Sequence, residues 1–344
     1  MAQVAKGPAA RYDGAREPIP PWPGRVVDMA PGKLYVRRAP AVDGTGPDGS
    51  PVPAATAEPA LFIHGLGGSS TNWTDLMDLL SRPGTARPGA PALDCTAVDL
   101  PGFGYSPPPA DDDYTVSGHA RAVIDLIDGL GTWPVHLVGN SMGGAVATRV
   151  AARRPDLVRT LALVSPALPD LRPRPLPLRL ALATAPGAGQ AIMSWLRHLP
   201  AERRTDQTVR DLFADPARLH PARREQEIAE LRRRDALPYA DRALMLSARS
   251  LVAEYFRTGP GSLWRDAARV RVPVLVLHGS QDRLVNPATA AKAARSFRLA
   301  RVVVLPGVGH VAMMERPALV AGELREFYEW VRAGCRPVTV ADPA

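Results

Sequence analysis

The sequence predicts an α/β protein with a mainly parallel, doubly wound sheet and a helical cap inserted after the sixth strand. Short apolar runs alternate with stretches of helical periodicity, which is the arrangement typical of parallel sheets. Glycine-rich turns directly follow several of these runs. Residues 166–268 interrupt this alternation, because they contain no apolar run typical of a strand. A chain of 344 residues is long enough for one large domain of this kind.

The predicted elements follow from local patterns. Apolar runs of strand length occur at residues 25–29, 33–38, 60–63, 95–98, 135–138, 160–164, 272–277 and 301–305. Helical periodicity marks residues 73–80, 116–130, 144–150, 287–297 and 317–331. We expect Asn72 to cap the first of these helices and Gly131 to end the second.

The order of these elements divides the chain. Residues 1–23 are rich in proline, glycine and alanine and are predicted to form a disordered or loosely attached tail. Residues 24–165 and 269–334 form the predicted core. Between them, residues 166–268 carry helical stretches separated by prolines, which we interpret as a helical cap, or lid. Residues 335–344 form a C-terminal tail.

Composition limits the class of protein. Hydrophobic residues make up 46% and charged residues 22% of the chain, as is ordinary for a soluble globular protein. The net charge of +8 comes from scattered arginines without interleaved aromatic residues, which argues against nucleic-acid binding. Neither a signal peptide nor a sufficiently long apolar stretch is recognisable, so we expect a cytoplasmic protein without stable membrane insertion. The sequence does not specify an oligomeric state.

The stretch at residues 135–150 carries the main chemical signal. It runs strand–turn–helix, and the turn Gly-Asn-Ser-Met-Gly places Ser141 in the pattern G-x-S-x-G. A serine on such a tight turn has a strained backbone and an outward-projecting hydroxyl, and the flanking glycines leave room for the chain to double back. Ser141 is therefore a candidate nucleophile.

Two glycine-rich loops follow strands in the first half of the chain. The loop at residues 64–69, His-Gly-Leu-Gly-Gly-Ser, lacks the patterns of a phosphate-binding loop. We favour an oxyanion loop, whose backbone N–H groups stabilise charge on a substrate carbonyl oxygen. Asp99 follows the strand at residues 95–98, and we expect it to tie down the next glycine-rich loop rather than to act in catalysis.

A serine nucleophile needs a base, and the base needs a carboxylate to orient it. His310 is the favoured base because it follows the last strand on a flexible Gly-Val-Gly turn. His64 and His278 each precede a glycine turn, and we expect them to brace it. The other histidines fall within a predicted strand, helix or cap: His119, His136, His198 and His220.

Asp282 is the favoured carboxylate, and Asp170 is its competitor. Asp282 lies on a short loop after the strand that should neighbour the one leading to His310. No site in this scheme requires a metal or an organic cofactor.

Residues 25–333 resemble an α/β-hydrolase. The resemblance rests on five motifs in the family's order: H-G-L-G-G-S, D-L-P-G-F-G-Y-S, G-N-S-M-G-G, G-S-Q-D and G-V-G-H. Ser141, Asp282 and His310 then follow the Ser…Asp…His order of such enzymes. The resemblance also implies an oxyanion hole made by the backbone N–H groups of Leu66 and Met142.

The family includes esterases, lipases, peptidases, C–C bond hydrolases, dehalogenases and epoxide hydrolases. The last two use an aspartate nucleophile, so Ser141 argues against them. We predict a serine hydrolase (carboxylesterase- or lipase-like) that cleaves small-molecule carboxylic esters with a hydrophobic acyl or alcohol group. The alternatives are a C–C bond hydrolase of ring-cleavage-type diketones and a non-catalytic binding protein of the same fold.

Overall fold

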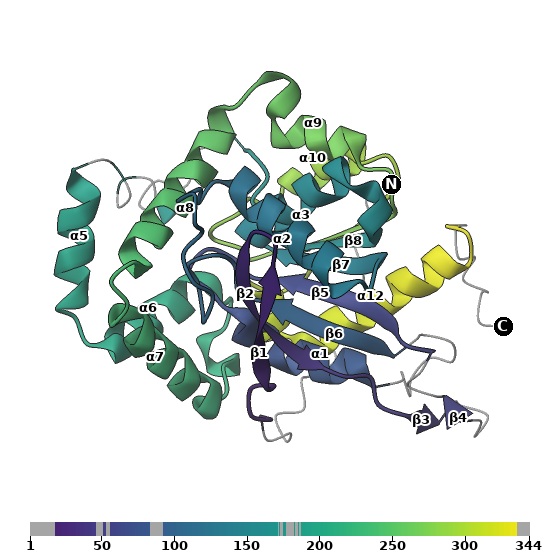
Figure 1. Cartoon of the computed structure of the whole chain (residues 1–344), viewed down its shortest axis with the longest axis horizontal. Helices are drawn as coiled ribbons and strands as arrows, with labels where there is room; N and C mark the ends of the chain where they lie inside the picture. The colour runs from purple at the N-terminus through teal and green to yellow at the C-terminus, as the bar shows by residue number, and fades with distance from the viewer. Residues whose placement is uncertain are drawn as a thin grey trace.

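A computed structural model describes residues 18–45, 51–52, 56–82, 92–170, 172, 175–176, 182, 185 and 187–335. Its centre is an eight-stranded sheet in the order β1-β2-β6-β5-β7-β8-β9-β10 (Figure 1). The strands are β1 (Gly24–Met29), β2 (Gly32–Ala39), β5 (Glu58–Ile63), β6 (Leu93–Val98), β7 (Val135–Asn140), β8 (Val158–Val164), β9 (Val274–Gly279) and β10 (Ala300–Leu305). β3 (Gly44–Thr45) and β4 (Pro51–Val52) form a separate pair.

The direction of the strands confirms the predicted sheet. β1 with β2, and β2 with β6, are antiparallel, and every other neighbouring pair is parallel. Parallel strands need crossover connections, and helices provide them here. The sheet is therefore mainly parallel, with a hairpin at one edge.

Helices cover both faces of the sheet. One face carries α1 (Thr74–Ser81), α11 (Ala312–Glu315) and α12 (Pro317–Arg332), and the other carries α2 (Val116–Leu130), α3 (Met142–Arg153), α9 (Leu263–Arg269) and α10 (Thr289–Ser296). β5 explains the two layers. Leu61 and Ile63 belong to the core that includes α2 and α3, whereas Ala60 and Phe62 belong to the core that includes α1 and α12. Alternate side chains of a strand point to opposite faces, so an all-apolar strand serves both cores.

The start of α1 differs from the prediction that Asn72 caps a helix. A 3-10 turn, η2 (Ser70–Trp73), precedes α1, and Ser69 caps this turn. Asn72 Oδ1 instead accepts the N–H of Ser69 at 3.1 Å. The added turn moves the cap upstream of Asn72, while the predicted apolar face of the helix is buried.

The chain is attached to the core before β1 begins. The indole N–H of Trp22 donates to the carbonyl of Thr74 at 3.2 Å, and the Trp22 carbonyl accepts from Arg37 at 2.5 Å. The predicted N-terminal tail otherwise falls outside the described residues up to position 17, as does the C-terminal tail after residue 335.

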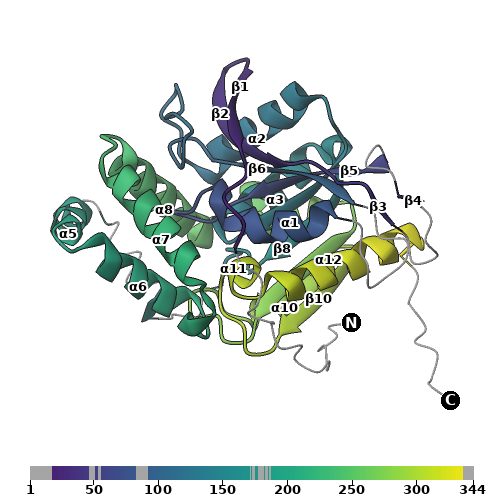
Figure 2. The same cartoon turned by 90° about the horizontal axis from the view of Figure 1, so that it is seen from below.

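A group of helices lies between β8 and β9. They are α5 (Ala188–Arg197), α6 (Ala201–Leu212), α7 (Pro221–Asp235) and α8 (Ala240–Phe256), with the 3-10 turns η4 (Pro216–Arg218) and η5 (Gly259–Gly261). Figures 1 and 2 show α5–α8 together at one end of the sheet. We call residues 188–256 the helical insertion. Leu168 before it is buried in the core, and α9 after it packs against α3.

Candidate active site

The order of the strands brings two loops together. β5 and β7 are neighbours at the centre of the sheet, although β6 lies between them in the sequence. In open α/β sheets, such a change of strand order opens a crevice at the carboxyl ends of the strands. Residues 64–69 follow β5, and Ser141 follows β7. The predicted oxyanion loop and the predicted nucleophile therefore lie at the same point of the sheet.

Ser141 occupies the strained turn that the sequence predicts. Its backbone angles are φ 53° and ψ −118°, a region that L-residues rarely adopt. Such a conformation costs on the order of 1–3 kcal/mol and needs support from its surroundings. The Ser141 N–H donates to Val164 O at 3.1 Å, and the Ser141 carbonyl accepts from Gly144 and Ala167, each at 2.9 Å.

Two glycines make the turn sterically possible. A Cβ on Gly139 would lie 2.6 Å from the carbonyl carbon of Gly143, where the chain doubles back. A Cβ on Gly143 would lie 2.5 Å from the carbonyl oxygen of His64. Any side chain at either position would force β5, β7 and α3 apart. The structure confirms that these glycines provide the room for the turn.

The loop after β5 touches the turn directly. A Cβ on Gly65 would lie 3.1 Å from the Cβ of Ser141 and 3.0 Å from Oδ1 of Asn140. Within the described part of the chain, no protein acceptor takes the backbone N–H of Leu66 or of Met142. Free backbone donors beside a nucleophile are what an oxyanion hole requires.

His64 braces this loop, as predicted. Its Nδ1 lies 2.7 Å from the carbonyl oxygen of Gly65, and its Nε2 accepts the N–H of Leu100 at 3.0 Å. Burial lowers the pKa of His64, which favours the neutral ring that these two bonds need. The ring therefore has a structural task and no free nitrogen for catalysis.

Asp99 also has the structural role that the sequence predicts. One carboxylate oxygen accepts the N–H of Ser70 at 2.6 Å, and the other accepts the N–H of Tyr105 at 2.8 Å. These bonds join the loop after β6 to the start of η2. The carboxylate is fully buried and occupied by backbone donors.

The structure pairs His310 with Asp282. His310 Nδ1 and Asp282 Oδ2 are 2.9 Å apart, and both residues are buried. Asp282 Oδ1 accepts the N–H groups of Leu284 at 2.8 Å and Val285 at 2.9 Å, which fixes the carboxylate. Since an ionised carboxylate can only accept, His310 Nδ1 is the donor and Nε2 is left as the acceptor.

Burial alone would raise the pKa of Asp282. The charge of His310 and the hydrogen bonds from His310 and Val285 outweigh burial and lower this pKa. Asp282 therefore stays ionised beside the imidazole. The competitor Asp170 instead accepts the side-chain amide of Asn286 at 2.9 Å.

The remaining histidines lie in other environments. His278 bonds Thr289 Oγ1 at 3.3 Å, rather than bracing its glycine turn as predicted, and burial lowers its pKa to about 4. His119 contacts Ser247, and burial lowers its pKa to about 3. The other three bond neither Asp282 nor Ser141: His136 bonds Glu58 and Thr160, His198 bonds Ser194, and His220 bonds Ala222.

Asn140 is a site residue that the sequence did not reveal. Its side-chain amide donates to the carbonyl of Val164 at 3.0 Å and to the carbonyl of His310 at 3.2 Å. The residue before Ser141 thus holds the backbone of His310.

Glu315 is a second unpredicted residue, and it is 1% exposed. Its carboxylate accepts the N–H groups of Gly309 at 2.7 Å and Ala214 at 3.1 Å, and it pairs with Arg218 at 2.6 Å. The His310 N–H itself donates to the carbonyl of Leu212 at 2.7 Å. The loop that carries His310 is therefore fastened to the end of α6 in the helical insertion.

The helix α7 joins the insertion to the oxyanion side of the site. Arg223 forms a two-point ion pair with Asp75 on α1, at 2.9 and 2.5 Å. Arg234 donates to the carbonyl of Gly67 at 2.9 Å. Glu227 accepts from the side chain of Asn72 at 3.3 Å. The insertion thus contacts both the loop after β5 and the loop that carries His310.

The described residues contain neither a metal-binding cluster nor a helix that could span a membrane. No group of three or more His, Cys, Asp or Glu residues is arranged there to hold a metal ion. None of the helices described is both long and apolar enough to cross a membrane.

Comparisons with known proteins identify the family of this fold. Residues 59–317 match the family model described as the alpha/beta hydrolase fold. Since this match covers most of the chain, the protein belongs to the α/β-hydrolase fold family.

The similar proteins include enzymes whose names describe different reactions. The dihydrolipoyllysine-residue acetyltransferase component of the acetoin cleaving system of Cupriavidus necator is 31% identical over 265 residues, which are 76% of this chain and 60% of that protein. This chain thus spans less than two thirds of that relative. Lipase 3 of Moraxella sp. is 26% identical over 285 residues, 80% of this chain and 79% of that protein. Among solved structures, a 2-hydroxy-6-oxo-6-phenylhexa-2,4-dienoate hydrolase from Rhodococcus sp. superimposes with a TM-score of 0.63 at 23% identity, over 86% of this chain and 95% of that one.

Proposed function

We propose that the protein is a serine hydrolase of carboxylic esters, with Ser141 as nucleophile, His310 as base and Asp282 as the group that orients His310. The hydrogen bond between Asp282 and His310 is the observation on which the proposal rests. It leaves His310 Nε2 as the only ring nitrogen that can take a proton, as this chemistry requires.

The reaction follows from these groups. Ser141 Oγ attacks the ester carbonyl carbon while its proton passes to His310 Nε2, and Asp282 stabilises the imidazolium. The N–H groups of Leu66 and Met142 hold the oxyanion. Collapse of the tetrahedral intermediate breaks the ester bond, and His310 gives its proton to the departing alkoxide. Water then attacks the acyl-enzyme by the same route, which releases the acid and restores Ser141.

We propose that the helical insertion caps this site and selects a hydrophobic ester. Apolar side chains support this proposal: Trp195 on α5 is 63% exposed and Phe256 at the end of α8 is 74% exposed. The contacts of α7 with residues 67 and 72 hold the insertion against the oxyanion loop. Lipase 3 of Moraxella sp., by its name, acts on lipid esters.

A C–C bond hydrolase is the second candidate. It is favoured by the turn G-N-S-M-G-G, which is frequent among hydrolases of aromatic ring-cleavage products, although the loop H-G-L-G-G-S is less like theirs. A non-catalytic binding protein is less well supported, because such proteins typically lose a triad residue.

A substrate panel tests the proposal. The purified full chain is assayed with p-nitrophenyl esters from acetyl to dodecanoyl and with a vinylogous 1,5-diketone of the ring-cleavage type. We expect the highest kcat/KM for an ester with a medium or long acyl chain. Turnover of the diketone in preference to every ester would favour the C–C hydrolase, and no turnover of any substrate would favour the binding protein.

A further inference from the structure

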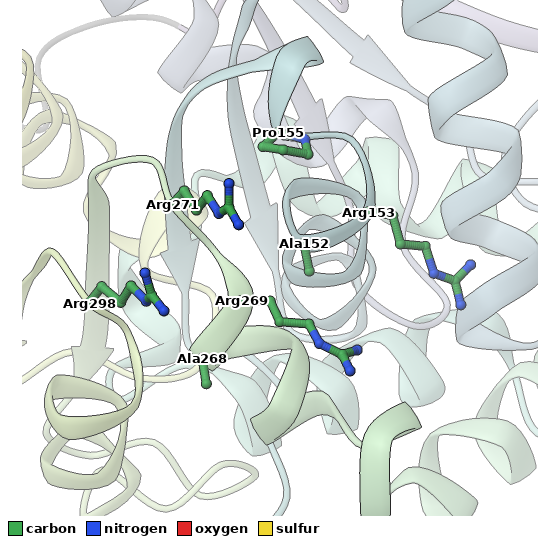
Figure 3. A pocket seen from close by; sticks show the side chains of 7 residues that line it. All are labelled: Ala152, Arg153, Pro155, Ala268, Arg269, Arg271 and Arg298. Atoms are coloured by element: carbon green, nitrogen blue, oxygen red, sulfur yellow. The ribbon is translucent and has the colours of Figure 1, made fainter.

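A pocket lies at the amino ends of the parallel strands, whereas Ser141 lies at their carboxyl ends. The pocket is open to solvent and has a volume of about 470 Å³, and its lining comes from the segments that lead into β8, β9 and β10 (Figure 3). Asp282 and His310 follow the carboxyl ends of the last two of these parallel strands. The pocket therefore opens at their amino ends, away from the proposed catalytic residues.

Four arginines line this pocket: Arg153, Arg269, Arg271 and Arg298. Figure 3 shows Arg153 at the end of α3, Arg269 at the end of α9, and the other two on the segments before β9 and β10. Among the described residues, no acidic side chain lines the pocket. The three remaining lining residues have no charge and short side chains, Ala152, Pro155 and Ala268.

These guanidinium groups have few partners in the described chain. Arg271 and Arg298 take part in no side-chain hydrogen bond or ion pair there. Arg153 donates only to the neutral hydroxyl of Ser117, at 3.1 Å. Arg269 donates to the carbonyl of Pro260 at 2.9 Å and lies 3.7 Å from Asp266, but Asp266 already holds Arg149 at 2.9 Å.

The nearby negative charges do not balance the arginines. Arg149 and Arg257 share two buried carboxylates, Glu254 and Asp266, so this cluster is neutral. Next to Pro155, Arg154 pairs with both Asp128 and Asp156, so this group has one net negative charge. Arg153 and Arg269 lie in the last turns of α3 and α9, and each helix end supplies about half a negative charge. Against four guanidinium groups, roughly two positive charges remain unbalanced at the pocket.

The sequence that contains β9 and β10 is also rich in basic residues, although Arg301 is paired with Glu326 at 2.6 Å. Between residues 267 and 303 the chain carries Arg269, Arg271, Arg283, Lys292, Arg295, Arg298 and Arg301. The only acidic residue in this stretch is Asp282, which is buried beside His310. The partial negative charges at the ends of α3 and α9 explain why arginines stand at positions 153 and 269. No such charge explains the arginines at positions 271 and 298.

We propose that this pocket binds a soluble small molecule carrying a phosphate or diphosphate group, with Arg271 and Arg298 as its principal contacts. A planar guanidinium matches phosphate oxygens with two parallel N–H donors, and it stays charged at every physiological pH. A volume of about 470 Å³ lies within the range of small-molecule sites. Binding at this site does not depend on the proposed ester hydrolysis.

Isothermal titration calorimetry tests this site. Inorganic pyrophosphate is titrated into the full chain at constant ionic strength, and the heat of binding is measured. The pocket variant combines Arg271→Gln with Arg298→Gln. The matched control combines Arg265→Gln with Arg295→Gln, which removes the same charge from exposed positions on α9 and α10 outside the pocket. We expect saturable one-to-one binding, weakened at least about tenfold in the pocket variant and less than about threefold in the control.

Three outcomes would overturn the proposal. Equal weakening in both double variants would indicate a general effect of charge. An absence of saturable pyrophosphate binding would exclude a small-molecule site. Binding to vesicles that contain phosphatidic acid, without binding to pyrophosphate, would assign the arginines to an anionic lipid surface instead. Unchanged thermal unfolding of both variants checks that neither has lost its fold.

Discussion

The side chain of Asn140 donates a hydrogen bond to the backbone carbonyl of His310 at 3.2 Å. The residue directly before the proposed nucleophile thus positions the proposed base, although the two residues are 170 positions apart in the sequence. The same amide also bonds Val164 at the end of β8. A single side chain therefore links the loops after β7, β8 and β10.

Replacing Asn140 with alanine should impair catalysis through the position of His310. We expect kcat for ester hydrolysis to fall about tenfold to a hundredfold, with a small change in KM, because a small misplacement of a base is costly. Asn286→Ala, which removes the partner of Asp170, is the control and should change kcat less than about threefold. A rise in KM at constant kcat would show that Asn140 acts on substrate binding instead.

Substitution of each candidate carboxylate shows which one orients His310. Asp282→Asn should lower kcat about ten-thousandfold, because an amide cannot hold the tautomer or stabilise the charge of His310. Asp170→Asn should leave kcat within about threefold, since Asp170 bonds Asn286 and not His310. Steady-state kinetics on one ester decides between them. A larger loss in the Asp170 variant would reverse the assignment.

Glu315 should contribute to both stability and catalysis. Glu315→Gln removes a buried charge paired with Arg218 and turns an amide group toward backbone donors, so we expect a loss of about 3 kcal/mol in the free energy of unfolding. We also expect kcat to fall, because the single amide oxygen of a glutamine cannot replace both carboxylate oxygens, one of which accepts from Gly309 and the other from Arg218. Urea unfolding and ester kinetics measure the two effects. Glu326→Gln, which alters a more exposed pair with Arg301, should have little effect on either quantity.

Glu227 should make stability depend on pH. Burial, aided by the charge of Glu230, raises its pKa from 4.5 to about 7. Because the folded protein holds this proton more tightly than the unfolded chain, the contribution of Glu227 is fully present below pH 4.5. It declines as the pH rises to about 7, by at most about 3 kcal/mol.

The Glu227→Gln variant should lack this decline, because a glutamine does not titrate and can still bond Asn72. Its free energy of unfolding should match that of the unmodified protein at pH 4.5 and exceed it at pH 8. Urea unfolding at several pH values provides the comparison. Parallel curves for the two proteins would show that Glu227 has an ordinary pKa.

Much of the fold was predictable because its signals are local. An apolar run, a glycine turn and an apolar helix face each depend on neighbouring residues, which is why β7, the Ser141 turn and α3 follow from residues 135–150. The pairing of Asp282 with His310 was predictable as well, because consecutive parallel strands place their carboxyl ends together.

The contacts that were missed join residues far apart in the sequence. Glu315 meets Ala214 across 101 positions, and Arg223 meets Asp75 across 148. A glutamate or arginine gives no local sign of such a partner, since its side chain suits a solvated surface equally well. The cap on η2 was missed because a 3-10 turn, which is frequent at the start of an α-helix, moved the beginning of the helical segment upstream of Asn72.

The central claim is that Ser141 is the nucleophile, and covalent labelling tests it most directly. The intact protein is treated with a fluorophosphonate, and the mass of each peptide is measured. We predict one adduct, on Ser141, and no adduct in Ser141→Ala, whose ester hydrolysis should be at least about a thousandfold lower. A single adduct on another serine, or substantial hydrolysis by Ser141→Ala, would contradict the claim.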